Sequence, residues 1–268
     1  MAQVLQRTPM GHYRVKNVVK SEVLKILTLR STAITVGVTV VAALLVTGLV
    51  ANNDVHQSPG FYSGFDPTQD SLIGLIVAGL TGGVFGALLI TGEYSSGTVR
   101  LSMAATPRRP ILLAAKLGVA AATVLVFCEI LSFVSFFLGQ VVLSGGGAPS
   151  ASLESPGALR AVVMTGAFIA LLSLMSFGFG LILRSTAAAI AAFVGVVFVV
   201  PLVMRAISEH AVRYVPINIL SNSITATVTQ GPGEPYQPVS PAIGLLLMAI
   251  YAAVPLAVGA VLFLRRDA

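Results

Sequence analysis

The residues best suited to specific chemistry lie in one charged segment between two apolar runs. It begins with Glu93 and continues through Gly97, Thr98 and Arg100, and a Pro-Arg-Arg-Pro stretch follows at 107–110. Charged side chains on a short helical stretch closed by prolines are typical of a docking surface. A catalytic centre would need clustered carboxylates, a Ser with a His or Lys base, or a metal constellation. The segment therefore predicts a contact with a partner protein rather than a reaction.

The rest of the sequence offers no cofactor site. It has no Gly-x-x-x-x-Gly-Lys-Ser/Thr run, in which backbone amides and a lysine would hold phosphates. The three histidines are scattered, and Cys128 is the single cysteine. Asp66 and Asp70 have a spacing suggestive of metal binding but stand in a proline-containing loop without partners. We expect no metal, cofactor or catalytic residue in this chain, and a membrane enzyme is the weaker alternative.

Glu129 stands in the middle of an apolar run. An ionisable residue within a membrane span faces protein or a water-filled path and is a functional candidate by default. One interpretation is contact with a cationic or polar substrate. The other is a structural hydrogen bond to a neighbouring Ser or Thr.

Six apolar runs are long enough to cross a bilayer, which takes about 20 residues per helix. The chain has 268 residues, 56% hydrophobic and only 10% charged, with a mean hydropathy of +0.92. A soluble domain carries about 25% charged residues, so the numbers favour an all-α integral membrane protein. The predicted spans are 31–51, 71–91, 117–142, 161–183, 187–204 and 242–264, within a transmembrane domain at 31–268.

Most of the 16 Lys and Arg residues precede the first span, follow the sixth, or lie between spans two and three. By the positive-inside rule this places both termini in the cytoplasm. The net charge of +6 then reflects orientation and contact with membrane lipids, and nucleic acid is not an expected partner. The segment 205–241 lies on the outer side, either as a re-entrant element that dips into the outer leaflet or as a surface loop.

A basic amphipathic helix precedes the first span. After a flexible tail at 1–12, residues 13–30 place valines, isoleucine and leucine at helical spacing with basic residues at the edges, which is typical of a helix lying in the membrane interface. Glu22 falls within the apolar stripe. Because a carboxylate facing lipid is costly, we expect it to meet a protein partner or Lys25, three residues on.

The second span is rich in glycine. Gly79 with Gly83, and Gly82 with Gly86, each have a Gly-x-x-x-Gly spacing, which permits close helix approach. Tight packing is the simpler interpretation, and smooth walls along a substrate path are the alternative.

Taken together, these features resemble the permease subunit of ABC-2-type ABC transporters. The most specific part is Glu93-x-x-x-Gly97-Thr98-x-Arg100, followed by Pro107-x-Arg109 and Lys116. Two further stretches are similar to that family: Lys20-Ser21-Glu22-x-x-Lys25 before the first span, and Gly178-x-Gly180 followed by Arg184-Ser185-Thr186-Ala187.

The resemblance implies a half-transporter that pairs with a second permease and with separate ATPase subunits, which bind ATP and Mg. The loop 92–110 would hold a coupling helix, with Glu93, Gly97, Thr98, Arg100, Pro107 and Arg109 carrying coupling beside Glu22 and Lys25. Substrates, drugs or lipids among them, would leave the cytoplasm or inner leaflet of a bacterial plasma membrane. A non-transporting accessory or sensor subunit is the alternative.

Overall fold

Six helical segments of the chain are long and apolar enough to cross a membrane, as the sequence predicts. The computed structural model describes residues 15–62, 64–105, 109–208, 210–226 and 238–265, so the predicted tail at 1–12 lies outside it. The helices are α1 Val15–Thr28, α2 Arg30–Val55, η1 Pro59–Tyr62, α3 Pro67–Leu72, α4 Leu75–Ser95, α5 Thr98–Ala105, α6 Arg109–Gly145, α7 Ala158–Leu183, α8 Thr186–Val194, η2 Gly195–Val199, α9 Val200–Ile207, η3 Ala211–Tyr214, α10 Pro216–Ser223 and α11 Pro241–Arg265.

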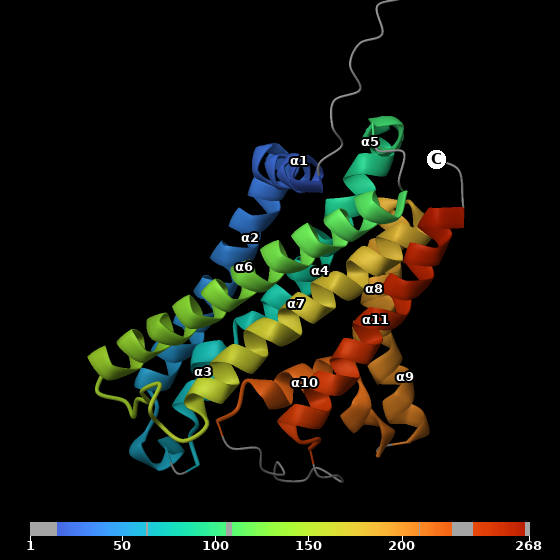
Figure 1. Ribbon diagram of the computed structural model, residues 1–268. Helices are drawn as coiled ribbons and strands as arrows, with labels where there is room; N and C mark the ends of the chain where they lie inside the picture. The colour runs from blue at the N-terminus through green and yellow to red at the C-terminus, as the bar shows by residue number, and fades with distance from the viewer. Residues whose placement is uncertain (1–14, 63, 106–108, 209, 227–237, 266–268) are drawn as a thin grey trace, which may run out of the picture.

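Several short helices lie at the two ends of the bundle (Figure 1). Helices α1 and α5 lie at one end, where α11 also finishes, and α3 and α10 lie toward the other. The start of α1 and the end of α11 are therefore on the same side of the bundle, as an even number of spans requires. Which side faces the cytoplasm stays a prediction from charge.

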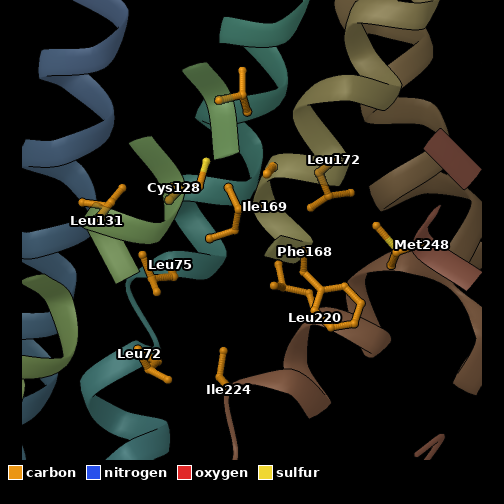
Figure 2. Close-up of a cluster of buried hydrophobic side chains, with 14 of the residues drawn as sticks. Leu72, Leu75, Cys128, Leu131, Phe168, Ile169, Leu172, Leu220, Ile224 and Met248 are labelled. Atoms are coloured by element: carbon orange, nitrogen blue, oxygen red, sulfur yellow. The ribbon is translucent and has the colours of Figure 1, made fainter. Parts of the chain in front are cut away.

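Helix α7 is the centre of the bundle. It packs against α4, α6, α8, α10 and α11, and the most apolar stretch of α7 is the most buried among the six candidate spans. Phe168, Ile169 and Leu172 project from it into the core, where Leu220 of α10 and Met248 of α11 meet them (Figure 2).

The structure differs from the predicted spans in three places. Residues 67–95 form two helices, α3 and α4, which are separated at Gly74, where an added Cβ would lie 2.0 Å from the Ala43 carbonyl oxygen of α2. Helix α6 begins at Arg109, eight residues before the predicted 117. The fifth span runs through a π-helical stretch, η2, before α9.

Several polar side chains within the spans are paired. Gln140 of α6 donates from Nε2 to the Pro67 carbonyl oxygen at 2.9 Å, and its Oε1 accepts from the Ala151 amide at 2.6 Å. The hydroxyls of Thr47 and Ser135 lie 2.8 Å apart between α2 and α6. Such bonds join helices where lipid offers no alternative partner.

The segment 205–241 contains ordered helical structure. Helix α10 packs against α7 and α11, and its Ile219 and Leu220 are buried. Whether this segment is a re-entrant element or a loop stays a prediction; residues 227–237 lie outside the description.

Candidate functional site

Three buried charges from three helices meet beside α5. Glu22 of α1, Glu93 in the last turn of α4 and Lys116 of α6 are only 5%, 7% and 4% exposed. The Lys116 ammonium donates to Glu22 Oε2 at 2.8 Å and to both carboxylate oxygens of Glu93. A buried charge is tolerated when it is paired and hydrogen-bonded. Lys116 thus connects the amphipathic helix α1 to two candidate membrane spans, the one that ends in α4 and its own, α6.

Lys25 completes the group, which we call the ion cluster (Glu22, Lys25, Glu93 and Lys116). Its ammonium lies 2.8 Å from Glu22 Oε1 and 3.6 Å from Glu93 Oε1, which confirms the pairing predicted from the three-residue spacing. It also donates to Ser102 Oγ of α5 at 3.0 Å. Burial lowers the pKa of Lys25, but the hydrogen bond to Glu22 and the charges of Glu93 and Glu22 outweigh it, so the net pKa is raised.

The ion cluster is balanced in charge and nearly filled. Two carboxylates face two ammonium groups, and the cavity beside them measures about 20 Å³, which is room for a single water. Among the described residues, this leaves no space for a substrate next to these side chains. The role that this arrangement supports is therefore structural. It fixes the relative positions of α1, α4, α5 and α6.

A tight turn joins α4 to α5. Gly97 has a φ of +71°, a left-handed conformation that favours glycine. The Thr98 hydroxyl lies 2.9 Å from that of Ser96, at the start of α5. The turn separates α4 from α5, and its left-handed position gives Gly97 a structural role.

Helix α5 has one buried and one exposed side. Val99 is 2% exposed and packs with Leu112 and Leu113 of α6, whereas Leu101 is 71% exposed. Arg100 is also exposed. An apolar side chain and a guanidinium therefore stand together on the outside of a helix whose other side is anchored.

Comparison with protein families identifies the chain. A family model described as ABC-2 family transporter protein matches residues 16–268. The chain belongs to the ABC-2 transporter family. This family provides the non-catalytic membrane components of transporters, so the protein is a multi-pass membrane permease. A comparison with curated protein sequences finds no significant match.

The permease places the other predicted coupling residues apart from the ion cluster. Arg109, at the start of α6, donates from Nη1 to the Leu264 carbonyl oxygen at 3.4 Å, near the end of α11. Pro107 lies outside the described residues. The predicted set therefore divides between the ion cluster (Glu22, Lys25, Glu93), the turn and α5 (Gly97, Thr98, Arg100), and a contact with α11 (Arg109).

Glu129 lies in the middle of α6 against α7. A Cβ added to Gly166 would lie 2.7 Å from the Glu129 carboxylate, so the carboxylate rests on the α7 backbone. Within the described part of the permease no side chain forms a hydrogen bond or ion pair with it. The nearby hydroxyl of Ser132 instead donates to the Val162 carbonyl oxygen. Its role in contacting a substrate stays a prediction.

The glycines of α4 form its contact with neighbouring helices. An added Cβ would lie 1.9 Å from the Ser173 carbonyl oxygen at Gly86 and 2.1 Å from the Phe193 ring at Gly83. At Gly82 and Gly79 it would meet side chains of α7 and α10 at 2.9–3.3 Å. All four glycines are buried inside this chain, which is the geometry of tight packing.

Sequence reasoning left Lys116 without an assigned partner and missed Ser102. Lys116 was a signal in itself, since a lysine about two turns inside a membrane helix requires a counter-charge. Glu22 and Glu93 were both identified as candidates from the sequence, but these residues are 71 positions apart in it. Only the fold brings them to one ammonium. Ser102 carries no such signal, because its hydroxyl is ordinary for a short exposed helix.

Proposed function

We propose that this permease exports its substrate by coupling to a separate ABC ATPase subunit through α5. The observation that carries the proposal is the ion cluster, which joins α1, α4 and α6 at the base of α5. A helix that transmits movement from a partner protein must be connected to the spans that it moves. The contacts of Lys25 and Lys116 supply that connection.

The exposed side of α5 supports a protein contact. Leu101 is 71% exposed beside Arg100, and arginine is enriched among the residues that contribute most to binding at protein interfaces. Val99 on the opposite side is buried in the bundle. The partner would bind ATP and Mg, since the four lysines of this chain stand at 16, 20, 25 and 116 and none lies in a phosphate-binding loop.

The remaining features of the proposal rest on charge and exposed apolar surface. The basic end of the bundle, with α1, α5 and the last turn of α11, would face the cytoplasm of a bacterial plasma membrane. Apolar side chains of α2 such as Ile34, Val41 and Leu49 are more than 60% exposed, which suits contact with lipid and with a second permease copy. The unpaired Glu129 favours hydrophobic or cationic substrates, drugs or lipids among them.

The test is retention of the ATPase by the tagged permease in mild detergent, followed by mass spectrometry. Wild type is compared with Leu101→Ala and with Leu202→Ala, whose leucine is equally exposed, at 71%, on α9. We expect a stoichiometric Walker-motif ATPase with wild type and Leu202→Ala. Its affinity should be about tenfold weaker with Leu101→Ala, because most of a buried leucine side chain is lost. Absence of any ATPase, or equal retention by both variants, would contradict the proposal.

A further inference from the structure

A second cavity lies at the end of the bundle opposite α5, between α9, η3 and α11. It has a volume of about 260 Å³, and its walls include Val196, Val200 and Met204 on one side and Tyr214 and Tyr251 on the other. An apolar cavity of about 150 Å³ already suffices to bind benzene. This cavity can therefore hold a substantial apolar group.

The cavity reaches the apolar outer surface of the permease. Val200 and Tyr214, which line it, are themselves 42% and 40% exposed. On α9, the neighbouring Leu202 and Val203 are 71% and 53% exposed. In a membrane span such a surface faces hydrocarbon, so the molecules that can reach the cavity are acyl chains.

The local structure keeps the cavity open. The backbone at Val196 belongs to the π-helical stretch η2, a departure from α-helix that is frequent at functional sites. Across the cavity, the Tyr251 hydroxyl donates to the Tyr214 carbonyl oxygen at 2.9 Å. Tyr214 is thereby held against α11 instead of collapsing onto α9.

A cation stands next to the cavity. The Arg213 guanidinium lies 4.7 Å from the centre of the Tyr214 ring, and its Nη2 donates to the Tyr214 hydroxyl at 2.6 Å. Its Nε is buried and has no hydrogen-bond partner among the described residues. Arg205 follows the lining residue Met204, so residues 205–213, which also contain Glu209, carry a net positive charge.

We propose that this cavity binds an anionic phospholipid, with an acyl chain between α9 and α11 and the phosphate at Arg213. The apolar walls and the access from the hydrocarbon surface select the chain. The arginine, with a free Nε donor, selects the negatively charged headgroup. An anionic lipid at a basic residue near the membrane surface gains about fivefold in affinity per charge.

The permease has no tryptophan, which permits a direct test. A single Met204→Trp substitution places a fluorophore in the cavity wall, and Leu202→Trp places one on the lipid-facing side of the same helix. Each variant is reconstituted in vesicles of phosphatidylcholine and phosphatidylglycerol, in which one lipid or the other carries brominated acyl chains that quench tryptophan on contact. The ratio of quenching by brominated phosphatidylglycerol to quenching by brominated phosphatidylcholine gives the relative lipid affinity at each position.

We expect phosphatidylglycerol to be favoured about fivefold at the Met204→Trp probe and not at the Leu202→Trp probe. Adding Arg213→Gln should abolish the preference at the first probe and leave the second unchanged. Equal quenching by both lipids at the Met204→Trp probe would overturn the headgroup assignment, and no quenching there would overturn lipid binding itself. Should Met204→Trp fail to fold, Tyr251→Trp replaces one aromatic ring by another on the opposite wall and gives the same readout.

Discussion

Removal of the Lys116 ammonium is the sharpest perturbation of the ion cluster. Lys116→Met keeps a long apolar stem of similar length but leaves Glu22 and Glu93, 5% and 7% exposed, without their shared partner. Breaking a buried pair in this way costs about 3–5 kcal/mol. Lys25 still lies 2.8 Å from Glu22 and neutralises part of the remaining charge. We therefore expect the lower end, about 3 kcal/mol.

The single cysteine provides the assay. Cys128 is 1% exposed in the core, so a thiol-reactive fluorophore labels it only when the bundle opens on heating. A loss of about 3 kcal/mol corresponds to a fall in the unfolding temperature of roughly 6–12 °C for a chain of this size. The matched control is Lys20→Met, because Lys20 is an exposed lysine on α1, the helix that carries Glu22. Surface changes of that kind cost less than about 0.5 kcal/mol.

The result that would refute this reasoning is an unfolding temperature of Lys116→Met within 1–2 °C (about the Lys20→Met shift) of wild type. That outcome would mean that Lys116 does not hold the two carboxylates. A second check is non-additivity. Glu93→Gln and Lys116→Met remove the same contact, so the double variant should lose less than the sum of the single losses. Strict additivity would show that the two side chains act independently.

Three other predictions use the same labelling assay. The Lys25 contribution, measured against Lys25→Met, should be constant from neutral pH up to 10.5 and decline only above it, because the folded-state pKa is raised from 10.5 and the stability is lost as pH rises through it. A decline between neutral pH and about pH 9, well under the unfolded pKa, would contradict this. Gly86→Ala should destabilise the bundle by more than about 2 kcal/mol, since its Cβ would meet a carbonyl oxygen at 1.9 Å. Gly92→Ala, whose Cβ would have nothing within 4 Å, should be neutral or stabilising by up to about 1 kcal/mol. Equal effects of the two substitutions would refute the tight packing at Gly86. Gly97→Ala should cost about 1–2 kcal/mol through its positive φ and Gly97→Asn less, and the reverse order would contradict the left-handed turn.

Hydrophobic length alone made the six spans predictable, because each run must cross the same bilayer thickness. The internal breaks were not predictable in this way. The π-helical stretch at 195–199 and the interruption at Gly74 lie within runs of uniform apolarity, where hydropathy carries no information about backbone geometry. The interruption at Gly74 coincides with a tertiary contact, the close approach of Gly74 to the Ala43 carbonyl oxygen.

Within the candidate site, local pairs were predictable and distant ones were not. The Glu22–Lys25 pair follows from helical spacing, and a carboxylate in an apolar stripe signals a missing partner. That the partner also includes Lys116, 94 residues away, depends on how α1 crosses α6. The start of α6 at Arg109 was also missed, because the charged residues at 108, 109 and 116 hide the continuity of the helix from a hydropathy criterion.

The ion cluster raises a question of purpose, since buried ion networks are often no more stabilising than apolar side chains of the same volume. If it serves stability alone, replacing all its buried members by neutral residues should be harmless. If it transmits movement from α5, the replacement should restore stability and still impair function.

The variant Glu22→Gln/Glu93→Gln/Lys116→Met removes every uncompensated carboxylate, so we expect its unfolding temperature to recover most of the loss seen with Lys116→Met. We also expect the retained ATPase to hydrolyse ATP without responding to the permease, because α1, α4 and α6 are then no longer joined by the bonds of Lys116 to Glu22 and Glu93 beside α5. Full recovery of both properties would show that packing, rather than charge, links α5 to the spans.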